Sequence, residues 1–293
     1  MPRAVSLIVN PNAGGGRAAA ALLEVEAALL AHGLRVSVHS TTGLENARDL
    51  ARSAIAAGEL AVTLGGDGLV GCVAGVLAGT DGVLGVLPGG RGNDFARVLG
   101  IPADPVEACA VLVGGAERRV DVGEVDGRPF IGIASCGFDS DANRIANETR
   151  LIGGNLVYTY AALRALASWR PARFELDLDG RERIAFSGYS VALANSRAYG
   201  GGMYVAPEAA LDDGLLDVVM SGRATRRRAL FDLPKLFDGS HARLPYVRTV
   251  RAAEVRLSAD RPFTVYADGD PIAELPATVR LRHRALRVLA PPG

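Results

Sequence analysis

Two acidic side chains lie inside glycine-rich runs in the first half of this 293-residue chain. Asp67 belongs to Gly65–Gly68, and Asp94 closes Pro88–Asp94, whose sequence is PGGRGND. Glycine runs leave backbone N–H groups open to a ligand, and such groups bind phosphate oxygens at tight turns and helix N-termini. Together with the two carboxylates, the runs predict a site for a phosphate-bearing ligand.

Each glycine run follows a short apolar stretch. Ala61–Leu64 precedes the first run, and Val83–Leu87 precedes the second. A short apolar stretch closed by glycine is typical of a buried strand whose exit turn needs a positive φ or a close approach of the backbone. Two such exits in one α/β unit lie side by side at the carboxyl end of a parallel sheet, where open α/β sheets bind ligands.

Two known phosphate-binding motifs can be tested on these residues. Gly66–Gly71 fits G-x-G-x-x-G after a strand, but a dinucleotide fold needs an acidic residue at the end of the next strand. That strand ends in Leu87–Gly89 and carries no carboxylate, so a dinucleotide fold is disfavoured. The motif G-x-x-x-x-G-K-[ST] is absent from the sequence, which excludes a P-loop. Glycines that serve only tight turns explain one such run but explain two poorly.

A third candidate turn lies near the N-terminus. Val5–Val9 predicts a buried strand, and Ala18–His32 has the apolar spacing of a helix that ends at Gly33. The turn between them places Asn10 and backbone amides at a helix N-terminus, which is a site for an anion. A purely structural turn between strand and helix fits these residues equally well.

The elements around these turns predict two domains. Through residue 115, strands alternate with helices, which indicates a parallel sheet with helices on both faces. From Glu117 onward short strands and turn residues predominate, as in an antiparallel β domain, and Leu151–Trp169 is predicted as a helix. The predicted strands of this half are Arg119–Val125, Pro129–Ala134, Arg173–Leu178, Ile184–Ala194, Leu215–Met220, Val255–Leu257 and Phe263–Tyr266. We expect the boundary near residue 120, giving domains over 1–120 and 121–279.

Composition narrows the class of protein. The chain is 49% hydrophobic and 22% charged, with 32 basic and 32 acidic residues. This charge balance gives no indication of a nucleic-acid partner. Cys72, Cys109 and Cys136 lack the spacing of a metal site or disulfide framework and indicate a reducing compartment. No apolar run approaches the roughly 18 residues of a membrane span. We therefore expect a cytoplasmic protein.

The glycine runs also resemble a known family. GGDG after one strand, and PGGRGNDFAR after the next, is similar to the catalytic domain of diacylglycerol kinases. The family pattern is GGDGT followed by P-x-G-T-x-N-D-F-A-R, so Leu69 replaces a threonine and Arg91 stands at a hydroxyl position. The resemblance implies an N-terminal doubly wound, Rossmann-like parallel-sheet domain and an antiparallel β-sandwich domain. It also implies a cleft between the domains, and a C-terminal tail, about 280–293, packed on the first domain.

The resemblance further implies ATP as the nucleotide and Mg²⁺ as the metal ion. Carried over residue by residue, the implied nucleotide contacts follow four successive strands. They are Asn10, Pro11, Asn12, Ala13, Gly14, Thr41, Gly65, Gly66, Asp67, Gly68, Leu69, Arg91, Asn93 and Asp94.

Two acidic turns in the second half have both an ordinary and a chemical interpretation. Asp212-Asp213-Gly214 is typical of a turn, but it resembles the family's D-D-G-x-L segment. That resemblance implies a structural Mg²⁺ held by the Ala210 carbonyl, the Asp213 carboxylate and the Leu215 carbonyl.

The second acidic turn is Asp268-Gly269-Asp270-Pro271, which is typical of a hairpin. It resembles the family's D-G-E-P segment, with Asp270 in place of glutamate. The resemblance makes Asp270 the general base that accepts the proton of a lipid hydroxyl, with Asp268 supporting it. The neighbouring negative charge is expected to raise one of the two pKa values.

The segment Arg223–Arg256 carries nine basic and three acidic residues with leucines and phenylalanines between them. It predicts either a solvated basic helix over the β domain or a docking face for anionic lipid headgroups.

The resemblance implies an ATP- and Mg²⁺-dependent lipid kinase, with diacylglycerol as the expected acceptor and phosphatidic acid as the product, in phospholipid metabolism. Its expected partners are a membrane surface, contacted transiently, and a second copy of the chain. Two alternatives stay open: a weak or inactive family member that senses nucleotide or lipid, and a kinase of a soluble alcohol.

Overall fold

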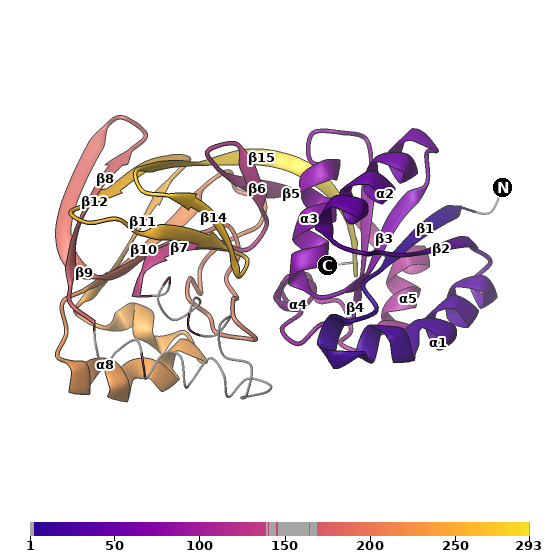
Figure 1. Ribbon diagram of the computed structural model, residues 1–293, viewed down its shortest axis with the longest axis horizontal. Coiled ribbons are helices and arrows are strands. Elements are labelled where there is room, and N and C mark those ends of the chain that lie inside the picture. Colours follow the sequence, from indigo (N-terminus) through magenta and orange to yellow (C-terminus); the bar gives the residue numbers. More distant parts are fainter. Residues whose placement is uncertain (1–2, 139, 141–144, 146–163, 165–168, 293) are drawn as a thin grey trace. The chain divides into compact units, whose positions relative to one another are not determined.

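The computed structural model describes residues 3–138, 140, 145, 164 and 169–292. It divides into two compact units, which are described separately (Figure 1). Unit 1 comprises Met1–Val122 and His283–Gly293, and unit 2 comprises Gly123–Arg282. The chain therefore passes between the units twice, within the strands β5 (Ala116–Val125) and β15 (Ala277–Ala290). The C-terminal residues belong to unit 1, where β15 joins the sheet.

Unit 1 is a parallel sheet with helices on both faces. Its strand order is β15-β4-β3-β1-β2, and the pairs within it run parallel. The four strands that precede the unit boundary are β1 (Ala4–Val9), β2 (Arg35–Ser40), β3 (Leu60–Gly65) and β4 (Val83–Pro88). All residues of β3 and β4 are buried, as expected for central parallel strands that are covered on both faces.

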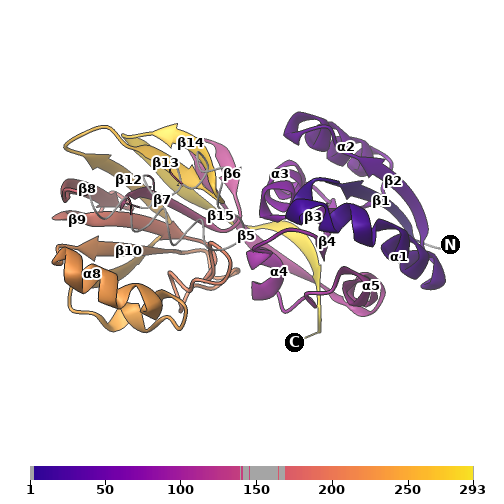
Figure 2. The same cartoon turned by 60° about the horizontal axis from the view of Figure 1, so that its bottom comes forward.

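Two helices contact each other on each face of this sheet (Figure 2). One pair consists of α1 (Arg17–Ala31) and α5 (Pro105–Gly114). The other consists of α2 (Leu44–Ala56) and α3 (Asp67–Leu77). A short helix, α4 (Asp94–Val98), begins at the last residue of the second glycine run.

Unit 2 is mostly antiparallel β structure. The strand β9 (Glu182–Ala194) pairs with three other strands of the unit, β8, β7 and β10. The other strands are β6 (Arg128–Phe130), β7 (Ile133–Gly137), β8 (Ala172–Leu178), β10 (Leu216–Gly222), β11 (Val247–Ala252), β12 (Glu254–Ala259), β13 (Thr264–Ala267) and β14 (Asp270–Glu274). One helix, α8 (Arg226–Asp232), follows β10.

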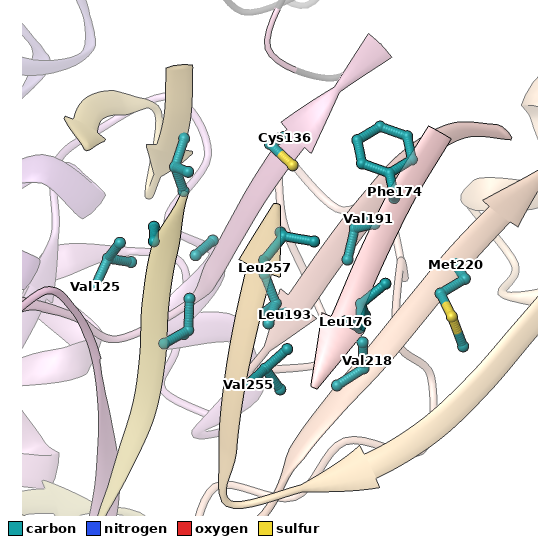
Figure 3. Packing of buried hydrophobic residues seen from close by; sticks show 14 of the residues in the cluster. Val125, Cys136, Phe174, Leu176, Val191, Leu193, Val218, Met220, Val255 and Leu257 are labelled. Atoms are coloured by element: carbon teal, nitrogen blue, oxygen red, sulfur yellow. The ribbon is translucent and has the colours of Figure 1, made fainter. Parts of the chain in front are cut away.

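The core of unit 2 follows from the two-residue period of its strands. Buried pairs two residues apart recur on neighbouring strands, and their side chains point into one apolar cluster (Figure 3). These pairs are Phe174 and Leu176, Val191 and Leu193, Val218 and Met220, and Val255 and Leu257. This cluster supports the hairpin that carries the second acidic turn, because Val265 and Ala267 of β13 belong to it.

Three hairpins of unit 2 turn on an Asp-Gly pair in which both residues have positive φ. The pairs are Asp126-Gly127, Asp179-Gly180 and Asp268-Gly269. Asp126-Gly127 and Asp268-Gly269 form two-residue turns, which match the twist of antiparallel strands, whereas Arg181 extends the loop at Asp179-Gly180 to three residues. The first two pairs join β5 to β6 and β8 to β9.

The fold class is the predicted one, a parallel α/β unit followed by a mostly antiparallel β unit, but three elements differ. Pro129–Ala134 is not one strand, because Ile131 and Gly132 interrupt it between β6 and β7. The expected C-terminal tail, about 280–293, is a strand for most of its length, because β15 extends over Ala277–Ala290. Arg223–Arg256 is no continuous helix, since only α8 and two short 3₁₀ turns precede β11. The predicted helix Leu151–Trp169 lies outside the described residues except at Arg164 and Trp169.

Candidate functional site

The predicted nucleotide contacts of unit 1 all follow the carboxyl ends of β1, β2, β3 and β4. Because these strands are parallel and adjacent, their ends lie along one edge of the sheet. Backbone hydrogen bonds connect the turns: Thr41 N donates to Val9 O at 2.7 Å, Asn10 N to Leu64 O at 3.1 Å, and Gly89 N to Gly65 O at 2.8 Å. The structure thus brings the three glycine turns and Thr41 together at this edge.

The strand order creates a switch point between β1 and β3. From β1 the chain crosses to β2 on one side, and from β2 it returns past β1 to β3 on the other side. The helices that follow β1 and β3, α1 and α3, accordingly belong to the two pairs that contact separately. Ligands of open α/β sheets bind in the crevice at such a point. Gly14 and Gly66 flank it, from the β1–α1 and β3–α3 turns.

The two central glycine runs contact each other through their backbones. A Cβ atom placed on Gly90 would overlap Gly66 Cα and would lie 3.1 Å from Gly66 N. A Cβ on Gly89 would lie 3.1 Å from Gly65 N and 3.0 Å from Ala18 Cβ. Of the two explanations for these glycines, close approach of the backbone is therefore correct and positive φ is not. Positive φ occurs instead in the N-terminal turn, at Gly14, Gly15 and Gly16.

An arginine that is absent from the predicted contacts connects the β1–α1 turn to the β4–α4 turn. Arg17 is the first residue of α1; its Nε donates to Gly14 O at 3.2 Å and its Nη2 donates to Gly90 O at 2.6 Å. Asn93 holds the conformation of the β4–α4 turn, to which it belongs. Its Oδ1 accepts from Gly90 N at 2.9 Å, and its Nδ2 donates to Gly90 O at 3.2 Å. The glycine backbone is thereby held in place before any ligand binds.

The two carboxylates of the glycine runs lie close enough to interact. Asp67 Oδ1 accepts from Phe95 N at 3.2 Å, at the N-terminus of α4. Burial, and secondly the negative charge of Asp94, raise the pKa of Asp67 above its ordinary value. Asp94 is itself buried and forms an ion pair with Arg97, whose Nη2 donates to Gly92 O at 3.0 Å. This acidic pair is the most negative feature of the glycine turns.

The two residues that depart from the family pattern differ in exposure. Leu69 is 3% exposed and belongs to the core face of α3. Its side chain packs against Gly65, where an added Cβ atom would collide with it. Arg91 is exposed, and no ion pair or hydrogen bond of its side chain is found within the described part of the chain. A free guanidinium therefore stands on the loop between β4 and α4.

In unit 2, the Asp268-Gly269 turn separates the roles of its two acidic residues. Asp268 accepts hydrogen bonds from three successive backbone amides, Ile131 N at 2.8 Å, Gly132 N at 2.9 Å and Ile133 N at 3.2 Å. Its carboxylate therefore fastens the β13–β14 hairpin to the segment before β7.

Asp270 begins β14 and is exposed, yet the protein atoms around its carboxyl group desolvate it partly and raise its pKa. The pKa shift that we expected is present, but its cause is desolvation and not the charge of Asp268.

The Asp212–Asp217 turn has a denser charge arrangement than the sequence indicates. Asp213 Oδ1 accepts from Leu215 N at 3.0 Å, and its Oδ2 forms an ion pair with Arg251. The Nε of Arg251 lies 3.7 Å from Asp217 Oδ2, a buried oxygen with no hydrogen-bond partner among the described residues. Burial, and secondly the charge of Glu208, raise the pKa of Asp217 to about 6. A surplus of negative charge thus surrounds one arginine.

Comparisons with known proteins cover both units. The sequence model of the diacylglycerol kinase catalytic domain matches residues 4–125, and that of the YegS C-terminal NAD kinase beta sandwich-like domain matches residues 132–290. A diacylglycerol kinase of Mycobacterium tuberculosis is 38% identical over 98% of this chain and 95% of its own length. The chain belongs to the bacterial diacylglycerol kinase family.

Other members of the diacylglycerol kinase family agree with this placement. A diacylglycerol kinase of Bacillus subtilis is 29% identical over 97% of this chain and 95% of its own length. The crystal structure of a putative diacylglycerol kinase from Bacillus anthracis superposes with a TM-score of 0.82, at 23% identity, over 99% of this chain and 98% of that one. The latter comparison supports the fold alone.

Membership in this lipid kinase family implies a phosphotransferase that uses ATP. Among the described residues no group of three or more His, Cys, Asp and Glu side chains is placed to hold a metal ion. A metal at the Asp213 turn would therefore depend on main-chain carbonyls, which is the ligand set that the resemblance implies. Likewise, no helix in the described ranges is long and apolar enough to cross a membrane.

Three positioning residues of this kinase were absent from the sequence prediction: Arg17, Arg97 and Arg251. Each binds a residue or turn that was predicted, but only the folded chain shows the pairing. A signal existed for two of them. Arg17 directly follows the first glycine turn, and Arg97 ends the N-D-F-A-R motif.

Proposed function

We propose that this chain transfers the γ-phosphoryl group of ATP to the free hydroxyl of diacylglycerol, giving phosphatidic acid and ADP. The observation that carries the proposal is the convergence of three glycine turns at the switch point of the α/β unit. The diacylglycerol kinase that is 38% identical over nearly the whole chain supports the choice of acceptor.

In this proposal the hydroxyl oxygen of the lipid attacks the γ-phosphorus, and the bond from that phosphorus to the bridging oxygen of ADP breaks. The hydroxyl proton passes to the carboxylate of Asp270. Phosphoryl transfer asks mainly for positioning and charge stabilisation, so the glycine amides and Arg91 contribute by holding phosphate oxygens. Asp268 acts as a positioning residue, because it fixes the hairpin that carries Asp270.

Magnesium is proposed at two places. At the Asp67–Asp94 pair it would neutralise a carboxylate whose pKa is raised by burial and, secondly, by the negative charge of Asp94. At the Asp213 turn, Asp217 Oδ2 is buried and accepts no hydrogen bond from the described residues, and only Arg251 Nε, at 3.7 Å, supplies positive charge to it there, which leaves room for a second cation nearby. Bound there, Mg²⁺ would supply positive charge to oxygen ligands of Ala210, Asp213 and Leu215.

The test of the proposed function is phosphorylation of a lipid panel with labelled ATP. Diacylglycerol, ceramide, sphingosine and a water-soluble alcohol are supplied in parallel, with ATP binding measured separately by calorimetry. We expect labelled phosphatidic acid as the main product. Binding of ATP without any lipid product would favour a sensor, and phosphorylation of only the soluble acceptor would favour the other alternative.

Replacing Arg91 by alanine is expected to weaken ATP binding by about ten- to a hundredfold, or about 1.4–2.8 kcal/mol. The reason is that charge-assisted hydrogen bonds from a guanidinium to phosphate oxygens are strong, and Arg91 has no other ion pair within the described chain. Calorimetric titration with ATP measures the change. Arg35→Ala is the matched control, an exposed arginine at the amino end of β2. An Arg91 variant that binds ATP as tightly as the wild type contradicts the phosphate contact.

Asp213→Ala is expected to abolish the Mg²⁺-dependent thermal stability that the Asp213 turn contributes. An ion that binds only the folded chain stabilises it by about 2.7 kcal/mol at a hundred times its Kd. Melting curves of wild type and variant, each with Mg²⁺ and with a chelator, measure this. Arg251→Ala distinguishes the metal from the ion pair, since it removes the Asp213 partner and keeps the ligands. Identical wild-type melting temperatures in Mg²⁺ and chelator would show that the turn binds no structural ion.

A further inference from the structure

Exposed apolar side chains gather on one short segment of unit 2. Leu230, Phe231 and Phe237 are 44%, 78% and 58% exposed. Single exposed apolar residues are ordinary on protein surfaces, but neighbouring ones mark an interaction site. Both aromatic residues among the exposed large hydrophobic side chains of the described ranges belong to this segment. We call Arg223–Phe237 the α8 segment.

The helix α8 presents arginine and apolar side chains together. It follows β10 and lies on the outside of unit 2 (Figure 2). Leu230 and Phe231 are three and four residues after Arg227, so all three lie on one helical face. Arg223 and Arg227 are exposed and have no ion-pair partner within the described residues. The α8 segment contains five basic residues and one acidic residue, Asp232.

The carboxylate of the single acidic residue in the segment is bound by neighbouring side chains. Asp232 is buried and accepts hydrogen bonds from Arg228 Nε at 2.6 Å and Tyr246 OH at 2.6 Å, with Lys235 Nζ at 2.8 Å. These hydrogen bonds, from Lys235 first and Tyr246 second, hold the pKa of Asp232 well below its ordinary value. Asp232 therefore stays charged, ties α8 to the residue before β11, and does not neutralise Arg223 or Arg227.

Further contacts fix the start of α8. Thr225 Oγ1 accepts from Arg228 N at 3.2 Å and caps the helix. Tyr189 OH donates to Ala224 O at 2.9 Å, and Arg226 Nη2 donates to Trp169 O at 3.2 Å. The exposed phenylalanines are thus carried by a segment that is anchored at several points, so their exposure is a property of the folded unit.

We propose that the α8 segment docks unit 2 on an anionic lipid bilayer. Phe231, Leu230 and Phe237 enter the interfacial layer, while Arg223 and Arg227 contact lipid phosphates. Aromatic side chains partition to this layer and basic residues beside them are attracted to anionic lipids, so the bilayer complements both properties of the patch. The inference rests on the proposed function, since a diacylglycerol kinase meets its acceptor in a membrane.

Vesicle co-sedimentation of the full chain tests the docking. It uses phosphatidylcholine vesicles with and without phosphatidylglycerol, in the absence of ATP and diacylglycerol. We expect binding only to the anionic vesicles, weakened by salt because salt screens exposed charges. Phe231→Ala and Arg227→Glu are each expected to weaken it by about tenfold. Equal binding of wild type to both vesicles, or unchanged binding by both variants, overturns the proposal.

Two control variants match these substitutions. Leu23→Ala removes a side chain of α1 that is also 78% exposed, and Arg181→Glu reverses a charge at the exposed Asp179-Gly180 turn. Both are expected to bind anionic vesicles like the wild type, and a loss as large as that of Phe231→Ala would overturn the assignment to α8. Wild-type dimers that Phe231→Ala dissociates would assign the patch to a second copy of the chain instead.

A kinase assay separates failure of the docking from failure of the proposed function. The α8 variants are expected to phosphorylate diacylglycerol in anionic vesicles slowly, and a water-soluble short-chain diacylglycerol at the wild-type rate. Wild-type rates in both assays overturn the docking and leave the kinase function intact. Specific vesicle binding by a wild-type chain that phosphorylates no lipid would overturn the function and leave the docking intact.

Discussion

Asp270→Asn is expected to lower kcat for lipid phosphorylation by at least about a hundredfold, the usual scale for the loss of a general base. ATP affinity is expected to remain at the wild-type level, because Asp270 belongs to unit 2 and the glycine turns belong to unit 1. The melting temperature is also expected to stay close to wild type, since the residue is exposed. Steady-state kinetics, ATP titration and thermal melting measure the three quantities.

The pKa of Asp270 gives this expectation a second readout. A general base acts only when deprotonated, so kcat/KM falls as the pH drops through the pKa of the base in the free enzyme. Desolvation raises this pKa above the ordinary value of 3.8. The acid limb of the kcat/KM profile is therefore expected above pH 3.8. An acid limb at or below that value, in an enzyme whose fold is intact there, would point to a different base.

Asp268→Asn is the matched comparison for Asp270→Asn. An amide has one oxygen where the carboxylate has two, so Asp268→Asn loses part of its bonding to three backbone amides. We expect it to lower stability by about 1–3 kcal/mol, the cost of leaving such donors unsatisfied. Asp270→Glu keeps the carboxylate and is expected to keep or raise activity. An active Asp270→Asn beside a folded but inactive Asp268→Asn would reverse the two roles.

The sequence carries most of the information on unit 1 because local signals agree there with the fold. Apolar runs bounded by glycine predict β3 and β4, and helical spacing predicts α1 with its stop at Gly33, which has a φ of +79°. Parallel strands with short turns leave few alternative arrangements for the glycine runs. The position of Asp67 and Asp94 at one edge follows from that topology.

The partners of these residues could not be predicted, because they depend on contacts between distant segments. Arg17 binds Gly90 O, 73 residues away, and Asp268 binds amides that precede it by more than a hundred residues. Local patterns record which residues favour turns, but they do not record which turn a side chain reaches. The same limit explains why the glycines were attributed equally to positive φ and to close backbone approach.

Gly90→Ala is expected to reduce ATP binding below detection while leaving both units folded. Its Cβ would overlap Gly66 Cα and would lie 2.9 Å from Asn93 Oδ1, so the β3–α3 turn and the β4–α4 turn must separate. Moving packed backbone in this way costs about 1–3 kcal/mol, as overpacking does elsewhere. The displaced amides of Gly66 and Gly90 would no longer face the same ligand. Calorimetric titration with ATP measures the loss, and circular dichroism checks the fold.

Gly114→Ala is the control that makes this expectation specific. Apart from its chain neighbours and the backbone of its own helix, no atom of the described residues lies within 4 Å of a Cβ at Gly114, which ends α5, so the same substitution there meets open space. We expect it to bind ATP like the wild type and to melt at the same temperature or slightly higher, because alanine favours helix more than glycine does. If Gly90→Ala binds ATP as tightly as Gly114→Ala, then the contact between the two glycine turns does not shape the nucleotide site. The phosphate-binding amides would then be assigned to the N-terminal turn alone.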